Sequence, residues 1–506
     1  MTREAESKRR LAGRLCVAAV AIFCAAAGCT DSLNAWPWAA APTGAAPLPD
    51  DLPPVEPDAP YAGAATTRPA ATRPAADVPG DATVDAYVRI ALRRNPGIRA
   101  ARRRIQRLRQ RIPQETALPD PKAEVAPVGE MAETAAGQVH TMIGVRQTFP
   151  APGKLSTRGR IAAREVAVAQ QELRRTKLRT VAEVRRAYWS YYAAARAIEV
   201  TRDGRALLDD IRRIARAKYE SGTAGQQDVL RATVAVGNVD RELARLRQQR
   251  RSAAAMLNRL MDRPTDAALP DPPPVDPRDL TVALEDLLTA AQHANPALQR
   301  LRERLRQQRL RRKLARLDYW PDVTVGAHYN VVDDEGLSAQ ANGDDQWWFS
   351  LGFNLPVWRG KLAAGEREAI ARWYETAAAL DDERSRVAFA VRDALIRAES
   401  DLRQAELLRD RVIPAAEAAI QAAAGGYQSG RDDFLTLLDN WRRRLEFERM
   451  YHAAVARLEQ DYADLERAVG RPLPRERVDA DGGDRVGASA AGAAAGATRP
   501  GGHGDE

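Results

Sequence analysis

The chain has 506 residues, of which 45% are hydrophobic, 29% charged and only 6% aromatic, and its formal net charge at pH 7 is +9. This length exceeds one small core and predicts two to four structural units or one repeated unit. The composition excludes a wholly disordered chain and is typical of long solvated helices. Because Arg is interspersed with Glu, Asp and Gln, the positive charge favours solvated helix faces over a nucleic-acid partner.

Residues 1–28 have the layout of a secretory signal. Basic residues precede an apolar run at 15–28, which is shorter than the roughly 20 apolar residues of a membrane-spanning helix. The run ends Ala-Ala-Gly-Cys and resembles a bacterial lipobox, so we favour cleavage before Cys29 and acylation of its thiol. The alternative is an ordinary cleavage after Ala27 that leaves Cys29 as a free thiol. Acylation would anchor the chain in outer-membrane lipid.

Two segments have compositions that disfavour packing. Residues 29–80 are rich in Pro and Ala and are expected to form a semi-extended tether behind the lipidated terminus. Residues 475–506 are rich in Gly, Ala and Asp and are expected to form a disordered tail. The folded part should therefore lie between them.

That folded part is an internal repeat, with one copy at 81–275 and the other at 276–474. Each copy is predicted to run helix, strand, strand, long helix and returning helix. Four landmarks recur in the same order: Asn95-Pro96 with Asn295-Pro296, Gly153-Lys154-Leu155 with Gly360-Lys361-Leu362, Tyr219-Glu220-Ser221-Gly222 with Tyr427-Gln428-Ser429-Gly430, and Arg263-Pro264 with Arg471-Pro472.

Apolar residues alternate at 141–149, 323–331 and 347–357, which predicts strands with one apolar face. That face would meet a second sheet in a soluble sandwich, or lipid in a membrane barrel. Four strands per chain cannot close a barrel, so in lipid several chains would have to share one. Four tryptophans are predicted to mark the bilayer interface, unless they plug the ends of a soluble sheet: Trp320, Trp347, Trp348 and Trp358.

The longest predicted elements are helices at 154–219 and 361–427, the second interrupted only by Pro414. Apolar residues recur at spacings of three and four in the long helix 154–219 and in the returning helix 226–262, as in a coiled-coil seam. Tyr-x-Ser-Gly turns separate each long helix from a returning one, at 226–262 and 434–470, and the glycines permit a tight reversal. The sequence thus predicts two helical hairpins.

These features in this order resemble the TolC-like outer-membrane efflux family over 81–473, and QTFPAPGKL at 147–155 is similar to its heavy-metal-efflux branch. The resemblance implies a mainly α fold with membrane β, in a homotrimer with a shared twelve-stranded β-barrel, four strands per chain, and a long periplasmic coiled-coil tunnel. It implies a periplasmic adaptor and an inner-membrane efflux pump as partners. The implied adaptor-docking tips are Ser221, Gly222, Thr223, Ser429, Gly430 and Arg431.

The same family narrows its tunnel entrance with acidic residues after the second tip. The matching positions are Thr436 and Asp439, so the resemblance implies a gate at Asp439, with Asp228 on the first hairpin as a lesser candidate. Thr436 departs from the acidic pattern and weakens the expectation of strong cation selectivity.

The expected function is a passive export duct, without enzymatic activity or cofactor. The five histidines lack ligand spacing, so no metal site is expected, and Gly153-Lys154 lacks the glycine and hydroxyl of a phosphate loop. The alternatives are a periplasmic coiled-coil adaptor, which would carry one hairpin inside a split β-rich domain, or a structural lipoprotein. A cytoplasmic scaffold would leave the signal unexplained.

Overall fold

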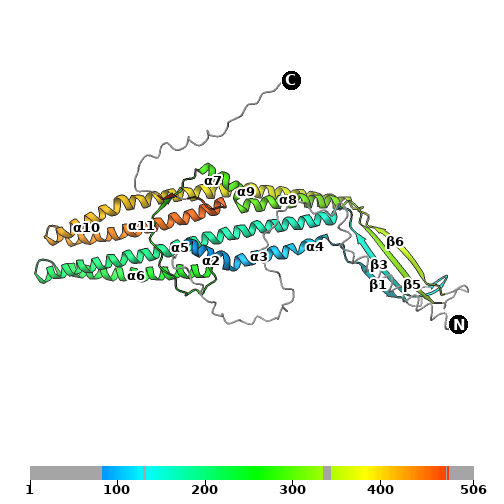
Figure 1. The fold of residues 1–506 in the computed structure, drawn as a ribbon, viewed down its shortest axis with the longest axis horizontal. Coiled ribbons are helices and arrows are strands. Elements are labelled where there is room, and N and C mark those ends of the chain that lie inside the picture. Colours follow the sequence, from blue (N-terminus) through cyan, green and yellow to red (C-terminus); the bar gives the residue numbers. More distant parts are fainter. Residues whose placement is uncertain (1–82, 129–132, 334–342, 475, 478–506) are drawn as a thin grey trace, which may run out of the picture. The chain divides into compact units, whose positions relative to one another are not determined.

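The computed structural model describes residues 83–128, 133–333, 343–474 and 476–477 (Figure 1). The predicted signal (1–28), Cys29, the tether (29–80) and nearly all of the tail lie outside these ranges. The described residues fall into two compact units. The strand unit comprises Glu115–Arg160 and Trp320–Leu355, and the remaining described residues form the helical unit.

The strand unit is an antiparallel sheet in the order β1-β3-β5-β6, which leaves β1 and β6 as its edges. Its strands are β1 (Lys122–Pro127), β3 (Gly137–Phe149), β5 (Val323–Asp333) and β6 (Gln346–Phe353), and the two-residue β2 (Glu133–Thr134) pairs with β3. The alternation that predicts strands at 141–149, 323–331 and 347–357 is confirmed, although β6 ends at Phe353.

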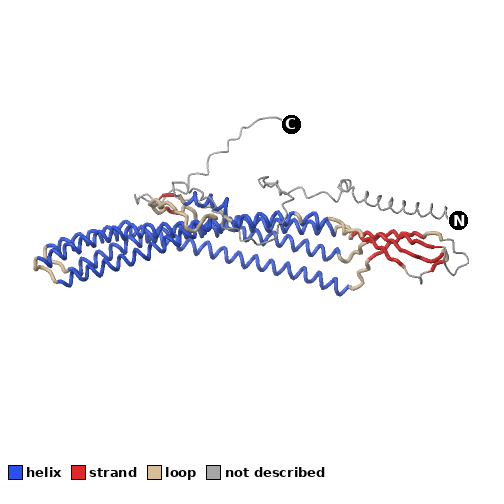
Figure 2. The backbone as a smooth tube through the Cα atoms, turned by 90° about the horizontal axis from the view of Figure 1, so that it is seen from below, coloured by secondary structure: helices blue, strands red, loops and turns tan. Residues whose placement is uncertain are grey.

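The helical unit is built mainly from two hairpins, whose helices appear blue in Figure 2. The first comprises α5 (Lys154–Glu220), whose first turns belong to the strand unit, and α6 (Gln226–Leu260). The second comprises α9 (Arg359–Leu407), α10 (Ile413–Gln428) and α11 (Phe434–Val469). With 67 residues, α5 is about 100 Å long. Each hairpin is preceded by shorter helices. Before the first hairpin these are α2 (Val84–Arg94), α3 (Pro96–Arg109) and α4 (Arg111–Thr116), and before the second they are α7 (Leu284–Ala294) and α8 (Pro296–Leu317).

None of the helices in the described part of the chain is long and apolar enough to span a bilayer.

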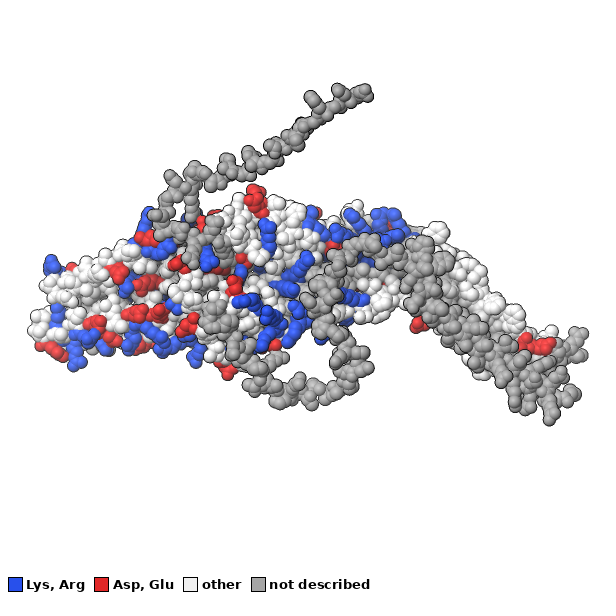
Figure 3. Space-filling view, viewed as in Figure 1, with Lys and Arg blue, Asp and Glu red and all other residues white. Residues whose placement is uncertain are grey.

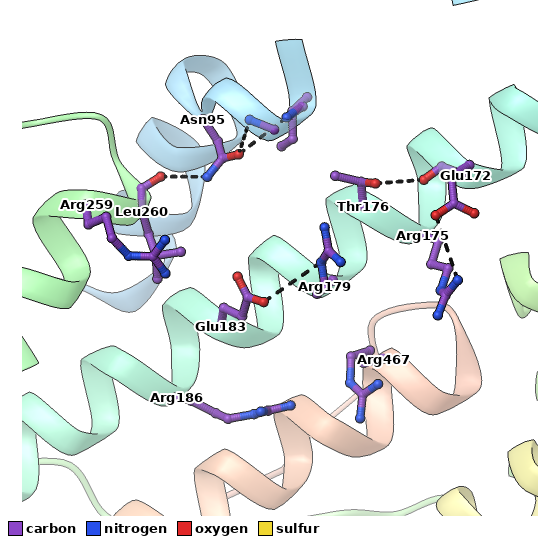
Figure 4. A network of polar contacts seen from close by, with 12 residues as sticks. Asn95, Glu172, Arg175, Thr176, Arg179, Glu183, Arg186, Arg259, Leu260 and Arg467 are labelled. Carbon is purple, nitrogen blue, oxygen red and sulfur yellow. Dashed lines mark hydrogen bonds and ion pairs between the residues drawn. The ribbon is translucent and has the colours of Figure 1, made fainter. Parts of the chain in front are cut away.

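Equivalent asparagines join the short helices to the end of the returning helix in each half. The Asn95 side chain accepts from the N–H groups of Gly97 and Ile98, and its amide donates to the carbonyl of Leu260 at 3.0 Å (Figure 4). Asn295 caps α8 in the same way and donates to the carbonyl of Ala468 at 2.7 Å. The following proline suits the first turn of a helix because that turn needs no N–H donor.

The apolar seam predicted for the long helices is confirmed by burial. Val184, Tyr188 and Ile198 of α5 are buried, as are Leu243 and Leu257 of α6. Around them, α5, α6, α10 and α11 share one core cluster near the hairpin ends, and α2 packs on α5 in a second. Helices of this length bury their stripes against each other because no compact core is available.

A single π-helical turn (Leu408–Val412) separates α9 from α10. It ends two residues before Pro414, which has no N–H to donate and whose ring would collide with a carbonyl of a regular helix. A wider turn accommodates this defect without ending the helix. The predicted long helix is therefore nearly continuous.

Two short strands lie outside the main sheet. β4 (Arg278–Asp279) pairs with β7 (Glu476–Arg477) in antiparallel register. The prediction that the chain is disordered from 475 onwards is therefore wrong for 476–477, because main-chain pairing, which composition does not reveal, holds these two residues.

His452 of α11 lies among aromatic side chains. Its ring centroid is 6.2 Å from that of Tyr192 and 5.1 Å from that of Tyr451. Burial, followed by the positive charge of Arg196, lowers the pKa of His452 to about 4 from its ordinary value of 6.5. The imidazole is therefore neutral at physiological pH.

This environment predicts acid sensitivity. The depressed pKa contributes stability that is complete above pH 6.5 and is lost as the pH falls towards 4, because the unfolded chain binds the proton first. We expect the melting temperature in detergent to fall across this window, and to fall less in His452→Leu. His293→Leu, at an exposed position of α7, should leave the pH profile unchanged. Parallel profiles for wild type and His452→Leu would contradict the assignment.

Candidate functional site

The turns that join the hairpin helices have the same backbone design. Gly222 and Gly430 adopt φ values of 78° and 77°, in the left-handed region that glycine tolerates. The N–H of Thr223 donates to the carbonyl of Lys218, and the N–H of Arg431 donates to that of Gly426. The six predicted docking residues therefore lie in the two reversals, and all six are exposed.

Side chains connect the two reversals within one chain. The ammonium of Lys218 donates to the carbonyl of Tyr427 and lies 4.5 Å from the centre of its ring. The Tyr427 hydroxyl donates to the Asp228 carboxylate at 3.4 Å. We call these three residues the tip latch. Because Lys218 and Asp228 belong to the first hairpin and Tyr427 to the second, the latch holds the hairpins together at the end where Figures 1 and 2 show both turns.

Tyr427 is the buried member of the tip latch, with 4% of its surface exposed and its ring edge-on to Phe434 at 5.5 Å. Burial, reinforced by the neighbouring Asp228 charge, raises its pKa to about 12. The hydroxyl therefore remains protonated at physiological pH and can donate to Asp228. The equivalent residue in the first half, Tyr219, is 45% exposed.

The two predicted gate residues have different surroundings. The Asp228 side chain is only 17% exposed and lies within 4.0 Å of Arg231, in addition to its bond from Tyr427. Asp439 is exposed and is paired with Arg443 at 2.9 Å, one turn along α11. Asp228 therefore contributes to the junction between the hairpins, while Asp439 presents a partly compensated charge at the surface.

One face of the sheet is apolar and exposed. Its side chains lie in register across the four main strands, because Val125 opposes Ile143, Tyr329 opposes Trp347, and Ala327 opposes Phe349. Phe349 is 74% exposed, which is unusual for so large an apolar residue. A contiguous surface of this kind indicates an apolar environment or partner.

The opposite face of the same sheet is mostly polar. Arg146 pairs with Glu124 at 2.6 Å across β3 and β1, and the Thr148 and Thr324 hydroxyls are 3.0 Å apart. Gly144 and Gly326 leave room for the His328 imidazole, which is 3.0 Å from the Ser350 hydroxyl. The sheet is therefore amphipathic, with its polar side chains satisfied on one face.

The predicted interface tryptophans occupy different positions. Trp347 lies on the apolar face opposite Tyr329, whereas Trp348 lies on the polar face and stacks on His328 with ring centroids 4.9 Å apart. Trp320 precedes β5 and is 65% exposed, and the exposed Trp358 occupies the N-cap position of α9 without a side-chain capping hydrogen bond. A strand alternates its side chains, so adjacent residues cannot both face lipid in one regular strand.

An ion pair between a buried lysine and a partly exposed carboxylate fixes the connections at one end of the sheet. Lys154, whose side chain is 5% exposed, donates to Asp322 at 2.8 Å and to the carbonyl of Trp320 at 3.2 Å. The same carboxylate accepts from the N–H of Ala151 at 2.7 Å and from the Asn354 amide at 3.3 Å. This Lys154–Asp322 cluster joins the segments after β3, before β5 and after β6, which gives the Gly-Lys motif a structural role.

A family model described as outer membrane efflux protein matches residues 87–262 and 287–471, more than half of the chain. The chain belongs to the outer membrane efflux protein family. Membership confirms the resemblance derived from the sequence, and with it the main functional prediction of an outer-membrane channel component for efflux. The nearly complete match of both halves does not favour the alternative of a periplasmic adaptor.

Individual members of the outer membrane efflux protein family are also similar. Outer membrane protein OprJ of Pseudomonas aeruginosa is 24% identical over 320 residues, which is 63% of this chain and 67% of OprJ. VceC of Vibrio cholerae has a TM-score of 0.65 at 19% identity, over 78% of this chain and 97% of its own. The open-state MtrE channel of Neisseria gonorrhoeae has a TM-score of 0.63 at 20% identity, over 78% of this chain and 90% of its own. These structures establish the fold.

The tip latch and the Lys154–Asp322 cluster were not predicted. The sequence provided only an indirect signal for them. Each contains one residue of a repeated motif, Tyr427 or Lys154, and the equivalent residue in the other half, Tyr219 or Lys361, is exposed. Among the described residues, no three His, Cys, Asp or Glu side chains are grouped so that they could hold a metal ion.

The buried ion pair of this efflux protein yields a stability prediction. Lys154→Met leaves Asp322 without its cation and should lower the free energy of unfolding by about 3–5 kcal/mol. The matched control is Lys361→Met at the exposed equivalent position, which should change it by less than about 0.5 kcal/mol. Denaturant unfolding in detergent provides the measurement. Adding Asp322→Asn to Lys154→Met should restore part of the loss, and equal effects of the two Lys variants would contradict the role of the pair.

Proposed function

We propose that this chain is the passive outer-membrane duct of a tripartite efflux system and acts as a homotrimer without enzymatic activity. Three copies would contribute four main strands each to a shared twelve-stranded barrel, and their helices would form a periplasmic tunnel. The observation that carries the proposal is the amphipathic sheet with two unpaired edges. Such a sheet is stable in lipid only when every edge strand has a partner.

The strand order is compatible with closure between copies. In the antiparallel order β1-β3-β5-β6, the edge strands β1 and β6 run in opposite directions. The β6 edge of one copy can therefore pair antiparallel with the β1 edge of the next, and every copy can use the same contact. The apolar face would meet lipid and the polar face a water-filled lumen.

The exposed reversals are the proposed docking tips for a periplasmic adaptor, which would connect the duct to an inner-membrane pump. Their support is the duplicated geometry at Gly222 and Gly430, which presents two similar surfaces per copy. A homotrimer would present six. The two family-model matches likewise support an internal repeat with copies at 81–275 and 276–474.

Opening of the periplasmic entrance is proposed to separate the hairpins at the tip latch. The latch consists of a single hydrogen bond from Tyr427 to Asp228 and the contacts of Lys218, so it can break without disrupting the apolar core. Asp439 remains the proposed charged gate residue, with its charge reduced by Arg443. The cargo is proposed to be selected mainly by the pump, with the heavy-metal branch as the substrate class that the 147–155 segment favours.

The tip latch provides the test of the duct. Tyr427→Phe removes the hydroxyl that binds Asp228 and should increase the fraction of time that the channel is open in planar bilayers. Tyr219→Phe makes the same chemical change at the exposed equivalent position and should leave the recordings unchanged. A chain that forms no channels would refute the duct, and channels whose opening is the same in both variants would refute the latch.

A second prediction concerns the membrane anchor. We propose that residues 1–28 are removed and that Cys29 is acylated, so cells given labelled palmitate should incorporate the label into the chain. Cys29→Ser should abolish the incorporation, because the serine hydroxyl cannot take the place of the thiol in this modification. Cys16→Ser and Cys24→Ser should retain it, since both residues lie in the removed segment. Label that persists in Cys29→Ser would contradict the anchor.

A further inference from the structure

Positive charge is concentrated in the short helices rather than spread along the chain. α3 has six Arg and no carboxylate, and α8 has nine basic residues and one Glu. Together they carry a net charge of +14, against +9 for the whole chain, so the remaining residues sum to −5. The mixed charge pattern expected from the sequence therefore fails for these two helices. Such asymmetry is typical of a surface that meets an anionic partner.

The end of α8 and the start of α9 bring part of this charge into one place. Glu366 of α9 pairs with Arg316 at 2.7 Å and with Arg312 at 3.7 Å. Arg359 lies over the ring of Tyr319 at 5.8 Å. These contacts hold the last turns of α8 beside the first turns of α9 within the helical unit.

Five exposed cations at this junction have no carboxylate partner among the residues described: Arg309, Arg311, Lys313, Arg359 and Lys361. We call them the crossing patch, because the chain passes here between helix and strand. Figure 3 shows Lys and Arg side chains gathered along the helices, including the end where α8 lies in Figure 1. Unpaired cations on neighbouring helices repel each other, so their retention requires an external partner or water.

The order of residues along the chain indicates which partner. Where the chain enters the sheet, the cations at 309–313 are followed by the exposed Trp320 and then by Val323, the first residue of β5. Leaving it, the exposed apolar residues Leu355 and Val357 are followed by Trp358, and then by the cations at 359 and 361. Both crossings therefore have the same succession of apolar, aromatic and cationic residues.

We propose that the crossing patch binds the anionic headgroups of phospholipids in the leaflet that faces the periplasm. This proposal rests on the membrane duct, since the apolar face must lie in the bilayer. The succession matches the layers of a bilayer, where hydrocarbon gives way to an interface that favours Trp and then to charged headgroups. Lys313 lies only about 6 Å along the helix axis from the end of α8 at Leu317, and Trp320 follows three residues after that end.

An anionic cell-wall polymer is the competing partner for such a surface. It would also attract cations, but it provides no reason for tryptophans to stand between the cations and the apolar strand on both crossings. A lipid headgroup layer does provide such a reason. Its attraction for cations falls off within a Debye length of about 8 Å, so the Lys and Arg side chains must lie close to the aromatic interface. The geometry therefore favours lipid.

The experiment uses the full chain purified in detergent and incubated with equimolar phosphatidylglycerol and phosphatidylcholine. Mass spectrometry then measures the ratio of the two lipids that remain bound after repurification. We expect phosphatidylglycerol to be enriched about fivefold for each Lys or Arg that contacts a headgroup. The enrichment should disappear in 1 M salt, where the Debye length is about 3 Å. The triple variant Arg309→Gln/Arg311→Gln/Lys313→Gln should lose most of it.

The matched control is Arg241→Gln/Arg247→Gln/Arg251→Gln, which removes the same charge from three exposed positions of α6. It should retain the enrichment. The proposal would be overturned if the wild type showed no enrichment, or if both variants lost it equally. It would also be overturned if the Arg309/Arg311/Lys313 variant kept the lipid enrichment but no longer sedimented with cell-wall sacculi. Flotation with pure phosphatidylcholine vesicles distinguishes a failure of the membrane duct from a failure of the lipid site. A chain that does not float refutes the membrane duct. A chain that floats but shows no phosphatidylglycerol enrichment refutes only the lipid site.

Discussion

An amphipathic sheet with two open edges is the constraint on which the rest of this structure depends. Its apolar face exposes large side chains such as Phe349, and among the strands that the structure describes β1 and β6 each have a neighbour on one side only. Neither feature is stable in water, and open edges are still less favourable in lipid, where a lost hydrogen bond has no replacement. The proposed association of copies would pair the edges, and lipid around the shared barrel would cover the apolar face. Water would then contact the long helices and the polar face of the sheet.

The two halves share one scaffold but have divided the roles of its repeated residues. Asn95 and Asn295 keep identical capping and tethering contacts, so the joint between short and returning helices is the same in both. Lys154, in contrast, is buried against Asp322, while its equivalent Lys361 is exposed. Two equivalent positions allow this division of roles, because only one of them must keep the structural contact.

Much of this architecture could be predicted from periodicity, and the remainder depends on contacts that leave no periodic trace. The alternation of apolar residues located β5 and β6, and the spacing in α5 located its buried face. The Lys154–Asp322 pair joins positions 168 residues apart, and Lys218 reaches a carbonyl 209 residues away. The π-turn was foreshadowed only by Pro414, and the opposite orientations of Trp347 and Trp348 require the strand register. Residues 1–82, including Cys29, lie outside the described structure and keep their sequence-based interpretation.

The Lys154–Asp322 cluster and the tip latch differ in how easily they can be broken. A gated duct requires the contacts at its entrance to break more easily than those beside its sheet. Breaking the Lys154–Asp322 pair costs up to about 3–5 kcal/mol, the range for a fully buried pair, because the Asp322 charge loses its cation. The tip latch instead divides its strength among three contacts: the long hydrogen bond from Tyr427 to Asp228, the cation–π contact of Lys218, and the hydrogen bond from Lys218 to the carbonyl of Tyr427. Each contact contributes on the order of 1–2 kcal/mol. Conformational coupling between sites is typically about 1–3 kcal/mol. A docked partner can therefore offset the loss of one latch contact at a time, while the same coupling energy is too small to break the Lys154–Asp322 pair.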